Sequence, residues 1–345
     1  MDRPRLLTPD RPTGLTRRSV LGFGAAAASA LLVPGCSRGR AEEPAPSESA
    51  TFATGNAGGV YNAFGAALCG LVSEVTGMDL RPIATDGSVE NLNLVAQRKA
   101  DLGFCTSDSA LAAYEGTGAF KNAHMRFYAL GRVYDNYVHV VVPMASKAQS
   151  LSDLNTKSSK KLRVGVGPKE SGTEIVSRLI LGTAGIHVEM VNLSLTDSIK
   201  LLKAKADKET APNGIDAFIW SGGVPTTPIA DLQKDLGFRL LNIGAVAQEI
   251  ALTNFGGFVV SAIPPSQYGL ASSVPTLAVP NYLIAKQGLS DSWAWWTVNT
   301  LFRRQNDLIA AKHPEAGSLD PRSAIATMPV PLHPAAERWY RQNHI

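Results

Sequence analysis

The stretch FATGNAGGVYNAFGAAL, Phe52 to Leu68, places small residues and an asparagine between a short apolar run and an amphipathic run. This order predicts a β-strand, a tight loop and an α-helix. A loop of this kind presents the free N–H groups of a helix N-terminus, which favour an anion. The stretch therefore predicts an anion-binding loop in an α/β fold.

The same order of strand, small-residue loop and helix occurs four more times without sequence repeats. The predicted strands of these units are 80–84, 102–105, 162–166 and 216–220. Strands that alternate with helices form parallel sheets covered on both faces, and ligands bind at the edge where the loops gather. Five units in two groups, in about 300 residues, predict two lobes that face each other across a cleft.

Two extended runs, 136–144 and 274–285, are predicted to join the lobes. Lobe 1 is then expected to contain residues 49–140 and 280–345, with the C-terminal helices returning to it. Lobe 2 is expected to contain residues 144–274. Two crossings form a hinge, so that closure on a ligand is mechanically reasonable.

The helix starts have recognisable capping signals. Ser88 is predicted as an N-cap, Ser171 with Glu174 has the capping-box pattern, and N-capping is the expected task of Ser107–Asp108.

Residues 1–35 are predicted to be a signal peptide. Arginines precede the apolar stretch Leu21 to Val33, which is too short to span a bilayer comfortably. TRRSVL, Thr16 to Leu21, resembles a twin-arginine export signal, and VPGC resembles a lipoprotein cleavage box in which Cys36 is acylated. The alternative is an ordinary cleaved signal with an incidental cysteine.

Residues 36–48 are polar and proline-containing, which predicts a flexible tether. We therefore expect an exported lipoprotein, anchored to the outer face of the cytoplasmic membrane or in the periplasm.

The charge of the chain gives no argument for nucleic-acid binding. The net charge is +4, but residues 1–35 hold five arginines against two aspartates, so the remaining chain is near +1. Cys69 and Cys105 are interpreted as two buried thiols rather than a disulfide, and no C-x-x-C motif is present.

Known catalytic and cofactor motifs are missing from the sequence. The first loop is neither a Walker A motif nor G-x-G-x-x-G, and no G-x-S-x-G or H-E-x-x-H occurs. The histidines are scattered, and His139 in an apolar strand is interpreted as a core residue. Trp293, Trp295 and Trp296 indicate helix packing. We expect a binding protein without cofactor or metal, not an enzyme.

The segments ATGNAGGVYNAFGAAL, VGPKESGTEIVSRLIL, DAFIWSGGVP and VPTLAVPNYLIA carry a family resemblance. Over nearly all of 49–345, the chain resembles the TAXI-type solute receptors of tripartite ATP-independent periplasmic (TRAP) transporters. The resemblance implies a two-lobed periplasmic-binding-protein-like (type II) fold that closes over a small carboxylate, such as glutamate or 2-oxoglutarate. It also implies delivery to a TRAP-type membrane permease. A free-standing sensor or scaffold lipoprotein with the same fold, signalling through a membrane partner, remains the alternative.

Several residues depart from the family's usual pattern. Asn56 replaces a glycine, Ala57 a threonine and Asn62 a tyrosine, and Thr106 stands where glutamine is usual. Lys169 would either add charge for a second carboxylate or pair with Glu170 in solvent. The sequence therefore leaves the particular ligand open.

The predicted ligand-binding residues lie on the loops and helix starts of both lobes, with the carboxylate seat expected at 171–173. Trp220 is open to two interpretations, a core residue or a residue that flanks the ligand. The predicted set is Asn56, Gly58, Gly59, Tyr61, Asn62, Ser88, Asn91, Ser107, Asp108, Ser171, Gly172, Thr173, Trp220 and Gly223.

Overall fold

The computed structural model describes residues 42–156, 160–207, 211–253 and 257–343. The predicted signal peptide, Cys36 and the beginning of the predicted tether lie outside these ranges. Within them, no helix combines the length and the apolar character that crossing a membrane requires.

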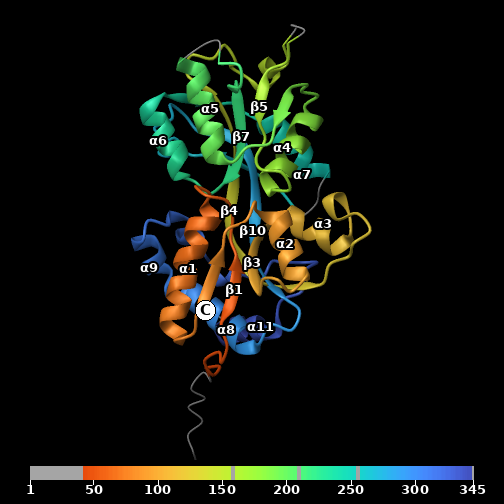
Figure 1. The fold of residues 1–345 in the computed structure, drawn as a ribbon, viewed down its shortest axis with the longest axis vertical. Coiled ribbons are helices and arrows are strands. Elements are labelled where there is room, and N and C mark those ends of the chain that lie inside the picture. The colour runs from red at the N-terminus through yellow and green to blue at the C-terminus, as the bar shows by residue number, and fades with distance from the viewer. Residues whose placement is uncertain (1–41, 157–159, 208–210, 254–256, 344–345) are drawn as a thin grey trace, which may run out of the picture. The chain divides into compact units, whose positions relative to one another are not determined.

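The described residues form one mixed ten-stranded sheet with the main strand order β2-β1-β3-β10-β4-β7-β5-β6 (Figure 1). The strands on the β10 side are parallel to one another, as are those on the β4 side. The strands are β1 (Ala50–Ala53), β2 (Leu80–Ile83), β3 (Leu102–Thr106), β4 (Phe127–Pro143), β5 (Arg163–Gly165), β6 (Glu189–Val191), β7 (Ala217–Gly222), β8 (Phe238–Leu240), β9 (Val259–Ile263) and β10 (Val274–Lys286).

β4 and β10 are long, antiparallel and paired with each other through the middle of the sheet. β10 pairs with β9 in its first half and with β3 in its second half, and β4 pairs with β7 and β8 in its second half. They are the two crossover strands, and both predicted runs lie in them. We call the β2-β1-β3 side lobe 1 and the β7-β5-β6 side lobe 2.

Helices cover both faces of the sheet in each lobe (Figure 1). Lobe 1 has α1 (Val60–Thr76), α2 (Ser88–Ala96), α3 (Ser107–Glu115), η1 (Gly118–Phe120), α8 (Asp291–Arg303), α9 (Gln305–Ala310), η3 (Pro314–Ser318), α10 (Pro321–Ala324) and α11 (Pro334–Gln342). Lobe 2 has η2 (Leu151–Leu154), α4 (Gly172–Thr183), α5 (Leu195–Asp207), α6 (Thr227–Asp235) and α7 (Gly244–Thr253).

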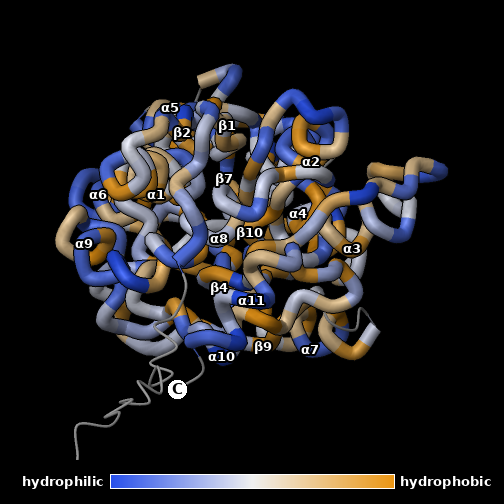
Figure 2. The backbone as a smooth tube through the Cα atoms, turned by 90° about the horizontal axis from the view of Figure 1, so that it is seen from below, coloured by the Kyte–Doolittle hydropathy of each residue, from blue (hydrophilic) through white to orange (hydrophobic). Residues whose placement is uncertain are grey.

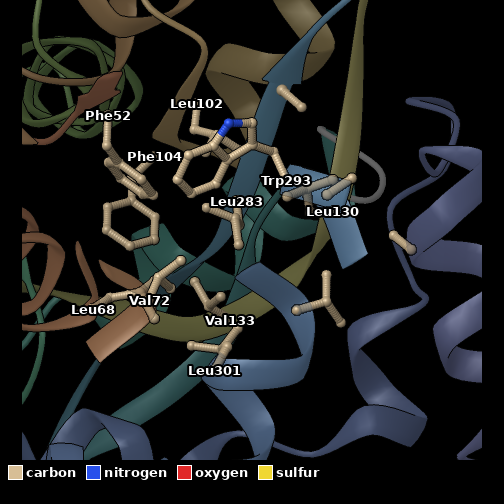
Figure 3. Packing of buried hydrophobic residues seen from close by; sticks show 14 of the residues in the cluster. Phe52, Leu68, Val72, Leu102, Phe104, Leu130, Val133, Leu283, Trp293 and Leu301 are labelled. Carbon is tan, nitrogen blue, oxygen red and sulfur yellow. The ribbon is translucent and has the colours of Figure 1, made fainter. Parts of the chain in front are cut away.

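The core of lobe 1 is built from residues that alternate along strands and recur along helices. Phe52 and Phe104 on neighbouring strands meet edge to face, and Leu68 of α1 and Trp293 of α8 belong to the same cluster (Figure 3). Seen from below, hydrophobic segments concentrate around β4 and β10, while segments near α9 and α10 are mostly hydrophilic (Figure 2). Each buried side chain of this kind contributes about 1.5–3 kcal/mol.

The two-lobed α/β fold with two crossover strands is confirmed, and the five predicted units are present. The sequence interpretation missed two further strand-to-helix units, β6 with α5 and β8 with α7. Their strands have only three residues each, which is too short for a clear period.

The capping predictions for Ser88 and for Ser107–Asp108 were wrong, and at α4 the predicted N-cap forms but the capping box does not. α2 is capped by Gly87, because Ser88 is its first helical residue and the Ser88 Oγ accepts from the Thr106 N–H. α3 starts at Ser107, directly after β3, and its N-cap residue is Thr106, which forms no side-chain cap. At α4, the Ser171 Oγ does accept from the Glu174 N–H, but the Glu174 carboxylate accepts from Glu170 instead of closing the box.

The last part of the predicted tether is attached to lobe 1. The indole N–H of Trp293 donates to the Glu48 carbonyl, and that of Trp296 donates to the Glu43 carbonyl. Arg338 of α11 forms an ion pair with the Glu43 carboxylate. Glu43 and Glu48, which lie in the predicted tether, are thus bonded to helices of lobe 1.

Candidate ligand-binding site

A cavity of about 40 Å³ lies between the lobes, at the ends of β1, β3 and β7. Its volume admits only a few water-sized groups without movement of the walls. It is lined by Gly55, Asn56, Gly59, Val60, Tyr61, Asp86, Gly87, Ser88, Thr106, Asn136, Ser171, Gly172, Thr173, Trp220, Ser221 and Gly222.

Four helix N-termini meet at this cavity. The N-cap residues of α1, α2, α3 and α4 are Gly59, Gly87, Thr106 and Ser171, and all four line it. N–H groups in the first turn of a helix have no acceptor within the helix, and the dipole places partial positive charge there. Among the described residues, no lysine, arginine or histidine lines the cavity, and the one carboxylate residue of the lining, Asp86, is exposed. The cavity therefore favours an anion through neutral donors.

Four side chains of the lining carry buried polar atoms that have no hydrogen-bond partner in the described structure. They are Asn56 Oδ1, Asn136 Oδ1, Trp220 Nε1 and Ser221 Oγ. A buried polar atom without a partner costs about 1–3 kcal/mol. A bound polar molecule would satisfy these atoms, because an indole N–H, a hydroxyl and two amides supply both donors and acceptors.

The lobes touch around the cavity. A Cβ added to Gly172 of lobe 2 would lie 2.9 Å from the Ser88 Oγ of lobe 1. A Cβ on Gly59 would lie 3.6 Å from Cη2 of Trp220, across the same gap. The Ser107 Oγ donates to the Gly257 carbonyl oxygen at 3.0 Å and links α3 to the segment between α7 and β9. The described structure is therefore the closed arrangement of the lobes.

Tyr61 forms a fixed apolar wall of the cavity. Its hydroxyl donates to the Asn281 Oδ1, and Asn281 in turn donates to the Tyr134 carbonyl oxygen at 2.8 Å. Its ring lies against Phe104, with 5.3 Å between the ring centroids. Burial raises the pKa of the Tyr61 phenol well above its usual value, so the group stays neutral.

The structure brings eight of the predicted residues together at the cavity. They are Asn56, Gly59, Tyr61, Ser88, Ser171, Gly172, Thr173 and Trp220.

Three predicted residues of lobe 1 lie away from the cavity lining. Asn91 is fully buried, donates to the Thr54 and Phe104 carbonyl oxygens and accepts from Thr85, so its amide holds three chain segments together. Asn62 donates to the Gly55 carbonyl oxygen. Gly58 is exposed and supplies the positive φ of 81° that the turn before α1 requires.

Ser107, Asp108 and Gly223 also lie outside the lining, at contacts between the lobes. Asp108 lies against Gly257, and both of its carboxylate oxygens are buried without a hydrogen-bond partner in the described structure. Burial raises its pKa. Gly223 lies against Glu315 of η3.

Sequence reasoning missed Asn136 and Ser221, which carry two of the four unpartnered atoms. A signal was present for both. Asn136 is a polar residue at the start of an apolar strand run, and Ser221 follows Trp220 directly at a predicted strand end. Thr106 had been noted only as a departure from a family pattern.

Other residues weighed in the sequence lie elsewhere. His139 is fully buried and bonded to the Tyr268 hydroxyl at 3.0 Å, which confirms it as a core residue. Cys69 and Cys105 are free and buried in clusters on different faces of the sheet, as predicted. Lys169 is exposed and does not line the cavity. The described residues contain no cluster of three or more metal-ligating side chains.

Two α/β lobes that enclose a cavity and share two crossing strands define the fold of periplasmic binding proteins. The chain belongs to the NMT1-like family, whose model matches residues 52–343.

Solved structures agree with this fold. One is MatC from Rhodopseudomonas palustris with bound malate, at 14% identity and a TM-score of 0.57, covering 86% of this chain and 98% of that chain. Another is the periplasmic binding protein BugD, at 10% identity and a TM-score of 0.55, covering 86% of this chain and 94% of that chain.

Proposed function

We propose that this protein is an exported solute-binding lipoprotein that captures a small carboxylate between its lobes and delivers it to a TRAP-type permease. One observation carries the proposal. Four helix N-termini and four unpartnered buried polar atoms face one cavity that has no basic side chain. This set of groups can hold and orient an anion without reacting with it.

The carboxylate seat is proposed at Ser171, Gly172 and Thr173. Gly172 and Thr173 are the first two residues of α4, so their N–H groups have no acceptor within the helix. The Ser171 Oγ is occupied by the Pro168 carbonyl oxygen and the Glu174 N–H, which leaves the backbone as the donor. Trp220 and Ser221 of β7 lie on the same side of the cavity and would bind the remaining polar atoms.

The proposal of a TRAP permease partner is based on the TAXI resemblance. The proposal of a lipid anchor is based on the residues around Cys36. The malate bound to MatC, a protein of the same fold, is in keeping with a carboxylate ligand. Asn56 is proposed to contribute to ligand specificity. It departs from the family pattern, and its Oδ1 lacks a hydrogen-bond partner in the described structure.

A thermal-shift screen of amino acids, keto acids and dicarboxylates tests the ligand class. We expect stabilisation by at least one carboxylate, since a ligand at 100 times its Kd adds about 2.7 kcal/mol. Stabilisation by sugars or cations alone would refute the carboxylate proposal.

Two variants of the same helix locate the seat. Thr173→Leu should abolish the shift, because Thr173 is 6% exposed in the cavity lining and a larger side chain would fill the seat. Thr183→Leu at the other end of α4 is the matched control. If the ligand still raised the melting temperature of Thr173→Leu by the same amount, the carboxylate would not bind at residues 171–173.

A further inference from the structure

A second cavity, of about 190 Å³, lies beside the crossover strand β4 and shares no lining residue with the first. Its lining comes from both lobes. Arg132, Tyr134 and Asp135 lie on β4, Glu315 lies on η3 of lobe 1, and Val224 belongs to lobe 2.

The Glu315 side chain of lobe 1 contacts lobe 2 at this cavity. A Cβ added to Gly223 of lobe 2 would lie 2.7 Å from the Glu315 Cγ and 3.0 Å from its Oε1. Glu315 is only 9% exposed, and its Oε2 is buried without a partner in the described structure. The Tyr134 hydroxyl, also buried and in the lining, has no partner there either.

No cation among the described residues neutralises the Glu315 carboxylate. Arg132, the basic residue of the lining, donates two hydrogen bonds to Asp135 at 2.8 and 2.9 Å. The other titratable groups near Glu315 are Tyr134 and Tyr137 of the lining, Tyr268 of lobe 2 and the preceding His313. A carboxylate removed from water without a counter-charge favours its neutral form.

We propose that closing of lobe 2 onto lobe 1 is coupled to uptake of one proton by Glu315. In the closed arrangement the proton comes from bulk water and remains on the carboxyl group. When the lobes separate, the Gly223 segment leaves, water reaches Glu315, and the proton returns to solvent. The inference deepens the proposed function, because the same closure encloses the ligand.

The direction of the pH effect follows from linkage. Burial raises the pKa of Glu315 from 4.5 to about 7 in the closed arrangement. Closure, and with it ligand affinity, therefore strengthens as pH falls from about 7 to 4.5 and is constant outside this window. Over the whole window we expect a gain of affinity on the order of 100-fold.

The test compares one protein held closed with one held open, and it needs no ligand. The Asp108 Cβ lies 3.5 Å from the position of a Cβ on Gly257, which is within the range for a disulfide between lobe 1 and lobe 2. Oxidised Asp108→Cys/Gly257→Cys should hold the lobes closed. Gly172→Leu should hold them apart, because its side chain collides with Ser88.

The measurement is the carboxyl ¹³C shift of Glu315 against pH in glutamate-labelled protein, assigned by loss of the signal in Glu315→Gln. We expect a midpoint near 7 in the closed protein and near 4.5 in Gly172→Leu. Glu115→Gln, an exposed position of lobe 1, should change neither titration. Should Gly172→Leu fail to fold, Gly257→Trp replaces it, because its side chain would meet Asp108 of lobe 1 at another contact between the lobes.

Equal midpoints in the open and closed proteins would overturn the proposal, as would an ordinary midpoint in the closed one. A carboxylate found by the screen gives a second measurement. Calorimetric titrations at pH 7, in buffers of different ionisation heat, should show proton uptake that disappears in Glu315→Gln. Failure to find any carboxylate would refute the proposed ligand class but leave the ¹³C result standing.

Discussion

Gly172 of lobe 2 lies directly against Ser88 of lobe 1, so that a Cβ at Gly172 would be 2.9 Å from the Ser88 Oγ. The Thr106 Oγ1 would lie 3.0 Å from the same Cβ. Because Ser88 and Thr106 are buried and bonded to each other, neither can move aside freely. Glycine at this position allows the N-terminus of α4 to reach the cavity.

Gly172→Ala is therefore predicted to weaken ligand binding. Overpacking of this kind costs about 1–3 kcal/mol, which corresponds to a Kd roughly 5- to 150-fold higher. Gly182→Ala in the same helix is the control, because nothing lies within 4 Å of its added Cβ. Titration calorimetry with the carboxylate from the screen measures both. Equal affinities in the two variants would show that closure does not depend on this contact.

Trp220→Phe removes an indole N–H that faces the cavity without a partner. We expect affinity for the ligand to fall about 10-fold, since one hydrogen bond contributes about 1 kcal/mol or somewhat more. Trp295→Phe is a matched control, because the Trp295 N–H is also buried and unpartnered but lies in the lobe 1 core. An affinity loss of the same size in both variants would refute a ligand contact at Trp220.

Asn91→Ala is expected to reduce stability and not specificity. The Asn91 amide makes three buried hydrogen bonds, to Thr54, Thr85 and Phe104. Its loss leaves those partners unsatisfied, which should lower the free energy of unfolding by about 2–4 kcal/mol. Urea unfolding measures the change, with Asn93→Ala in the same helix as control. If Asn91→Ala kept its stability but lost ligand binding, Asn91 would be a ligand-binding residue, as the sequence had predicted.

His139 should make the fold sensitive to acid. Burial lowers the pKa of His139 from 6.5 to about 4, so the unfolded chain binds the proton more readily. Stability from this group is present above pH 6.5 and is lost progressively as pH falls to 4, by about 3 kcal/mol in total.

The measurement for His139 needs a background without Glu315, whose raised pKa acts in the opposite direction between pH 4.5 and 7. We expect Glu315→Gln to lose stability between pH 6.5 and 4.5, and Glu315→Gln/His139→Gln to lose clearly less. Parallel stability curves for the two proteins would contradict the assignment to His139.

The sequence predicted the fold well, because the fold is encoded in local patterns. The stretch from Phe52 to Leu68 forms the end of β1, a loop and the first half of α1. The run 274–285 forms β10, whereas the run 136–144 covers only the second half of β4. The loops that follow β1, β2, β3 and β5 were correctly expected to meet at one cavity, since parallel strands place them at one edge.

The roles of individual polar residues were harder to predict, because they depend on contacts between distant segments. Ser88 has the residue type of an N-cap, but the Thr106 N–H, 18 residues away, occupies its hydroxyl. Asn91 resembles a ligand-binding amide until three separate chain segments are seen to share it. No local pattern shows that the Asn62 amide is occupied while a polar atom of Asn56 is left without a partner.

The C-terminal helix α11 completes the core of lobe 1, far along the chain from the strands that it packs against. The Tyr340 hydroxyl donates to the Leu130 carbonyl oxygen of β4, and Trp339 belongs to the same core cluster as Phe52. Lobe 2 has all of its elements once the chain has reached β10, whereas lobe 1 also needs α11. A product truncated before Pro334 would therefore keep α4, with its proposed anion seat, but would lack the complete core of the lobe that faces it.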